Sequence, residues 1–76
     1  MNGVTHAAEA YLAAHPGDEA GAAAAGYIAA LRVIRATDPH AIPVQSPDVR
    51  AAMAAVDIAA VEAWISANWN DIEEVA

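Results

Sequence analysis

Alanine is the residue that most constrains how this chain can fold, because it makes up 23 of the 76 residues. Alanine is the best helix former, yet it contributes only one methyl group to a core. β-branched and aromatic residues never alternate over a useful length, so the sequence predicts no β-strand. We therefore expect an all-α fold with a core built largely from small side chains.

The predicted core is thin for a chain of this length. Residues 1–76 are long enough for a single small helical domain, and a domain of this size buries only about 60% of its unfolded surface. Such domains usually need a disulfide, a metal or a second subunit to be stable. The chain has no cysteine, so a disulfide is excluded. We therefore expect association with another copy or with another protein.

Start and stop signals divide the chain into three predicted helices. The predicted helices cover about residues 6–14, 19–36 and 47–69, followed by an acidic tail over residues 71–76. The tail is expected to be either disordered or a last helical turn. The segment 38–46 contains two prolines and is predicted to be an extended loop.

Three of these boundaries depend on specific residues. His15-Pro16-Gly17 should end the first helix, because the residue before a proline is pushed out of the helical region. Asp18 should cap the second helix, and Ser46 followed by Pro47 should begin the third. Two apolar loop residues, Ile42 and Val44, are expected to fold back over the helices.

The second and third predicted helices should form an antiparallel hairpin, with the short first helix packed beside it or exchanged onto a neighbour. Both long helices are apolar on nearly every face, which is typical of helices inside a bundle. Gly21 and Gly26 suggest the close approach of another backbone, since neither favours the helix. We therefore predict a homo-oligomeric helical bundle; the alternative is that the alanine surfaces are simply exposed.

The large apolar side chains on these faces are the predicted interface. They are Tyr27, Ile28, Leu31, Ile34, Met53, Val56, Ile58, Val61, Trp64, Ile65 and Trp69.

The charge of the chain limits its partners. The net charge is −7, with three arginines and no lysine. Binding to a nucleic-acid backbone or to an anionic membrane needs clustered cations, so neither is expected. The N-terminus has no basic residue and no apolar run, and the longest uncharged stretch, residues 20–31, is too short to cross a membrane. We expect a cytoplasmic protein.

No pattern in the sequence predicts catalysis or a cofactor. The two serines have neither a nearby histidine nor a nucleophile-elbow pattern. The glycine spacing over residues 21–26 imitates a phosphate loop but lacks the following lysine. The three histidines do not have the spacing of metal ligands. Asp57 is expected to be partly buried and paired with Arg32 or Arg35, as a structural ion pair.

The positions of the arginines suggest one candidate ligand site. The expected hairpin would bring Arg32, Arg35 and Arg50 to its loop end, beside His40 and the positive N-terminus of the third helix. A helix N-terminus with arginines is a plausible site for an anion.

The sequence therefore leaves two functions open. The first is a small acidic helical module or oligomeric subunit that binds other proteins and is not an enzyme. The alternative is an oligomer that binds a small phosphate-bearing anion at the arginine end. In its layout of a short helix, a helical hairpin and a proline-rich loop, the chain is similar to small phage-encoded helical proteins that block host defences. That likeness, which rests on layout alone, implies either a bound defence enzyme or a sequestered nucleotide.

Overall fold

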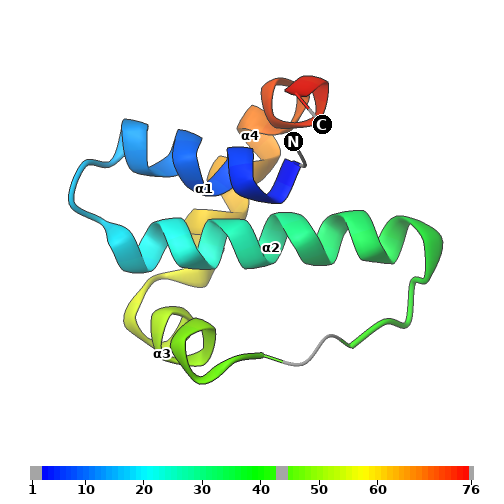
Figure 1. The fold of residues 1–76 in the computed structure, drawn as a ribbon, viewed down its shortest axis with the longest axis horizontal. Helices are drawn as coiled ribbons and strands as arrows, with labels where there is room; N and C mark the ends of the chain where they lie inside the picture. Colours follow the sequence, from blue (N-terminus) through cyan, green and yellow to red (C-terminus); the bar gives the residue numbers. More distant parts are fainter. Residues whose placement is uncertain (1–2, 43–44, 76) are drawn as a thin grey trace.

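A computed structural model describes residues 3–42 and 45–75, which form four α-helices and no strand. The helices are α1 (Gly3–Ala14), α2 (Glu19–Thr37), α3 (Pro47–Ala55) and α4 (Ile58–Val75), as Figure 1 shows. The all-α prediction is confirmed for this part of the chain. Val44, one of the two loop residues expected to fold back, lies outside it.

The cap residues act as their sequence positions predict. The Asp18 carboxylate accepts a hydrogen bond from the Gly21 amide at 2.9 Å and begins α2. The Ser46 hydroxyl accepts one from the Val49 amide at 3.2 Å, and Pro47 occupies the first turn of α3. The start of α1 was predicted three residues too late, an error of the size common for helix ends that are predicted from sequence.

The single helix predicted over residues 47–69 is wrong, because the chain breaks at Val56 and Asp57. Val56 is extended, with φ −120° and ψ 162°. Asp57 then begins α4: its carboxylate accepts from the Ala60 amide at 3.4 Å, and its carbonyl accepts from the Val61 amide at 3.1 Å.

A further prediction is corrected at α4. Asp57 is exposed and serves as a helix cap, so the partly buried ion pair expected for it is not its role. Of the two forms expected for the acidic tail, disorder or a last helical turn, the structure has the helical one as far as Val75.

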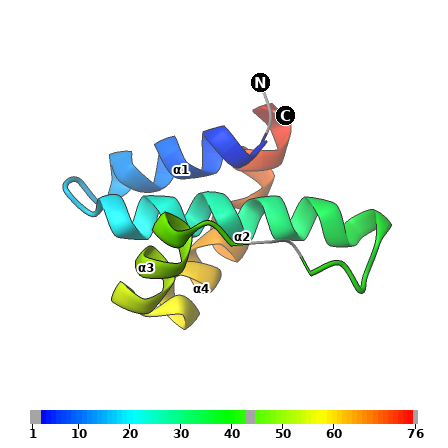
Figure 2. The same ribbon diagram turned by 60° about the horizontal axis from the view of Figure 1, so that its bottom comes forward.

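The helices are arranged around α2, which contacts the other three. α1 runs antiparallel beside the first half of α2, and α4 crosses it, so that the start of α1 and the end of α4 lie close together (Figures 1 and 2). Gly17, with φ 87°, makes the turn between α1 and α2 in a backbone conformation that favours glycine. The break at Val56 and Asp57 turns α4 back toward α2 instead of continuing α3.

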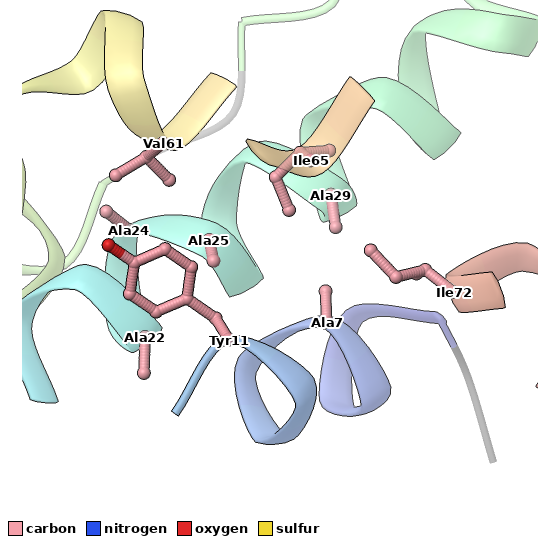
Figure 3. Packing of buried hydrophobic residues seen from close by; sticks show 9 residues of the cluster. All are labelled: Ala7, Tyr11, Ala22, Ala24, Ala25, Ala29, Val61, Ile65 and Ile72. Carbon is pink, nitrogen blue, oxygen red and sulfur yellow. The ribbon is translucent and has the colours of Figure 1, made fainter. Parts of the chain in front are cut away.

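The core consists of a few large side chains resting on alanines. Figure 3 shows Val61, Ile65 and Ile72 of α4 pointing toward the alanines of α2 and α1, with the Tyr11 ring between the helices. Ile65 and Ile72 are fully buried. The alanines of this cluster are Ala7, Ala22, Ala24, Ala25 and Ala29.

The small residues of α2 do permit a close approach, and the segment that approaches is α1 of the same chain. At Gly21, a Cβ atom would overlap the Asp18 carboxylate and would lie 2.5 Å from Cε1 of the Tyr11 ring. This crowding explains why the position holds glycine despite the cost to the helix.

The folded chain exposes 4672 Å², close to the roughly 4,400 Å² expected for a monomeric protein of its mass. The total surface therefore gives no argument for a second copy. Any case for association must depend on particular exposed side chains.

We predict that Gly21→Ala lowers the free energy of unfolding by about 1–3 kcal/mol, because the added methyl group overpacks the contact with Tyr11 and Asp18. Urea unfolding followed by circular dichroism measures this change. Ala23→Gly, at an exposed position of the same helix, is the control for helix propensity and should cost about 1 kcal/mol. A stabilised Gly21→Ala variant would contradict the packing.

Candidate functional site

The C-terminal third of α2 extends beyond the other helices. Residues 32–40 are all exposed, and Figures 1 and 2 both show this end of α2 projecting past α1 and α3. Val33 and Ile34 on this end are 49% and 41% exposed, and Ile42 in the following loop is 87% exposed. We call Val33, Ile34 and Ile42 the α2-end patch. The expectation that Ile42 folds back over the helices is wrong.

A hollow of about 240 Å³ lies between α2 and α4, next to this projecting end. Two turns of α2 and one turn of α4 supply its lining. The lining residues are Ile28, Leu31, Arg32, Arg35, Glu62 and Ser66.

Each of the two arginines in the hollow is held by a neighbour. Arg32 Nη1 donates to the Ser66 hydroxyl at 3.2 Å, and its guanidinium lies 4.5 Å from the centre of the Trp69 ring. This is a favourable cation–π geometry. Arg35 Nε donates to the Ala41 carbonyl at 3.1 Å, which ties the loop to the end of α2.

The other two residues of the predicted anion site, Arg50 and His40, do not line the hollow. Gln45, just before α3, lies beside the middle of α2, where its amide donates to the Tyr27 hydroxyl at 3.4 Å. Tyr27 precedes Arg35 by about 12 Å along the helix. α3, which carries Arg50, therefore begins beside the middle of α2, and His40 is exposed in the loop.

The predicted interface residues separate into three groups. Val61 and Ile65 are buried in the core of the chain itself, so no partner is needed to cover them. Ile34 is exposed. The others are partly buried, and they are Tyr27, Ile28, Leu31, Met53, Val56, Ile58, Trp64 and Trp69.

Sequence reasoning missed Val33 and Ile42 as candidate interface residues. Val33 is absent from the predicted interface residues, and Ile42 was expected to be covered. The length of α2 was a usable signal. α2 is seven residues longer than α1, so α1 cannot cover α2 along its whole length.

A second cluster of polar and aromatic side chains joins the turn after α1 to α4. The Tyr11 hydroxyl donates to Asp18 Oδ2 at 3.0 Å. The His15 ring stacks on Tyr11 at 4.3 Å between centroids, and Trp64 meets Tyr11 edge-on at 5.1 Å. Burial, followed by the hydrogen bond to Asp18 and its negative charge, raises the pKa of Tyr11. The polar groups of Tyr11, His15 and Asp18 all have hydrogen-bond partners nearby, so this cluster stabilises the fold.

Within residues 3–42 and 45–75, no three histidine, aspartate or glutamate side chains gather as metal ligands. No helix in the same part of the chain is long and apolar enough to cross a bilayer.

Comparison of the chain with protein-family models, with curated proteins and with solved structures finds no match in any of the three.

We predict that the free energy of unfolding falls as pH rises above about 10, the usual tyrosine pKa. The raised pKa keeps Tyr11 protonated in the folded chain at pH values where the unfolded chain has lost that proton. The stabilisation is therefore complete below pH 10 and is lost as pH rises through the folded pKa. Urea unfolding at a series of pH values measures the slope.

Tyr11→Phe should remove this pH dependence. At neutral pH it should lower the free energy of unfolding by about 1 kcal/mol, because the variant lacks the hydrogen bond to Asp18. Tyr27→Phe is the matched control and should keep the alkaline slope. Equal slopes in the two variants would show that Tyr11 is not the group that titrates.

Proposed function

We propose that this protein acts by binding another protein through the α2-end patch. The observation that carries the proposal is the exposure of three large apolar side chains, Val33, Ile34 and Ile42, at one projecting end of the molecule. Exposed apolar side chains that share one region often mark an interaction site. A projecting helix end, without core packing of its own, is also marginally stable until it docks.

The partner is either a second copy of this chain or a different protein. A homo-oligomeric bundle, built by pairing the projecting ends of α2, would cover the α2-end patch and is one form of the proposal. Each copy carries a net charge of −7, so two copies repel at long range, and pairing is favoured by salt.

We propose binding and not catalysis because of the chemistry of the exposed side chains. Most side chains of the α2-end patch and of the hollow are apolar groups or guanidinium groups, which recognise partners and are neither nucleophiles nor general bases at neutral pH. The apolar exposure and the two arginines of the hollow are both features of recognition surfaces.

A second candidate is binding of a small phosphate-bearing anion, which the pairing of Arg32 and Arg35 at one hollow favours. Glu62 lines the same hollow, and its negative charge opposes a multiply charged anion. We therefore rank protein binding first.

The test is photo-crosslinking in cells, with benzoylphenylalanine placed at Ile34, at Ile42 and, as control, at Ala23. Ala23 is exposed on the same helix but lies in its N-terminal half. We expect an adduct of one defined mass from the first two positions and none from the third. Mass spectrometry of the adduct distinguishes a second copy from another protein.

To test whether crosslinking depends on the patch, Val33→Asp is combined with the photo-crosslinker at Ile34. The added charge in the α2-end patch should abolish the adduct. Sedimentation velocity of purified protein over a range of concentrations then measures self-association directly. Equal labelling from Ala23 and Ile34, or no adduct from either patch position, would overturn the proposal.

A further inference from the structure

We propose that the hollow between α2 and α4 binds a carboxylate side chain of the partner, carried on a segment that also presents apolar residues. This inference rests on the proposed protein-binding function and specifies the chemistry of the partner. Its occupant is an aspartate or glutamate flanked by residues such as leucine.

The two guanidinium groups of the hollow are positioned before any partner arrives. Arg32 is fixed by its hydrogen bond to Ser66 and its stacking on Trp69, and Arg35 by its hydrogen bond to Ala41. Each of these hydrogen bonds uses one of the five N–H donors of a guanidinium group. The remaining donors suit a planar carboxylate, and a fixed arginine loses less entropy on binding.

The size of the hollow favours a side chain over a free small molecule. Pockets for drug-sized ligands usually enclose about 300–1,000 Å³ and bury most of the ligand. This hollow measures about 240 Å³ and is open to solvent. It suits one inserted side chain whose neighbours rest outside.

The surroundings of the hollow supply the apolar contacts for those neighbours. Ile28 and Leu31 form part of its lining, and Val33 and Ile34 are exposed on the adjoining turn of α2. A partner segment seated on the arginines would therefore also contact apolar side chains of the same helix.

Charge favours a carboxylate over a phosphate. Two arginines and one glutamate line the hollow, which gives a formal charge of 2 − 1 = +1. A carboxylate carries one negative charge, whereas a phosphate group carries up to two at neutral pH. The chain as a whole carries −7 and repels an acidic segment at long range, so a carboxylate is recognised only at short range, by the two arginines of the hollow.

Nuclear magnetic resonance of the arginine side chains tests the proposal, since the full chain contains only Arg32, Arg35 and Arg50. The probe is a capped leucine-glutamate-leucine peptide, and its control has glutamine at the centre. We expect saturable shifts of the Arg32 and Arg35 Nε–Hε signals and none of Arg50. The glutamine peptide should bind at least about tenfold more weakly, since a charged hydrogen bond is lost.

Matched variants separate the hollow from the overall charge. Arg35→Gln and Arg50→Gln remove the same charge, one inside the hollow and one on α3. Arg35→Gln should weaken binding of the glutamate peptide about tenfold, and Arg50→Gln should leave it unchanged at constant salt. Circular dichroism confirms that both variants are folded.

Four results would overturn the proposal: equal binding of the two peptides, equal shifts of all three arginines, tighter binding of inorganic phosphate than of the glutamate peptide, or no shift at saturating probe. The phosphate result would reassign the hollow to small anions. None of these outcomes changes the crosslinking at Ile34 and Ile42, which tests the α2-end patch independently. Failure of this inference is therefore distinguishable from failure of the proposed function.

Discussion

The contact between α1 and α2 is the constraint on which the rest of the structure depends. It is possible only because α2 presents small residues to α1, and at Gly21 even one methyl group would meet the Tyr11 ring and the Asp18 carboxylate. The same carboxylate caps α2 and accepts the Tyr11 hydrogen bond, so helix start, turn and packing are coupled in one place. Trp64 then packs against the edge of Tyr11, which links α4 to the same contact.

The break at Asp57 brings the few large apolar side chains of α4 into the core. A straight helix from Pro47 onward would carry its apolar faces away from α2, whereas the break directs Val61, Ile65 and Ile72 onto the alanines. Each of these side chains contributes roughly 1.5–3 kcal/mol when buried. These side chains pack near the middle of the molecule, and the last turns of α2 stay uncovered. The candidate site lies at this uncovered end of α2.

The sequence was sufficient for the helical class and for the starts of α2 and α3, because the caps Asp18 and Ser46 are local signals. It was insufficient at Asp57, where an aspartate inside an alanine-rich run was interpreted as a partly buried, paired charge although aspartate is also a preferred N-cap. The pairing of Arg32 and Arg35 followed from their helical spacing. That Arg50 and His40 lie outside the hollow could not be predicted, because their positions depend on contacts between distant residues, such as that of Gln45 with Tyr27.

Because much of the core consists of alanine, few substitutions are possible there. Ala7, Ala24, Ala25 and Ala29 are completely buried, and every amino acid except glycine is at least as large as alanine. A substitution at these positions therefore either introduces a larger side chain, which clashes with its neighbours, or introduces glycine, which destabilises the helix. We expect tolerated changes in related sequences to concentrate at the exposed positions of α3 and at the projecting end of α2, so the proposed binding surface can diversify while the interior stays nearly fixed.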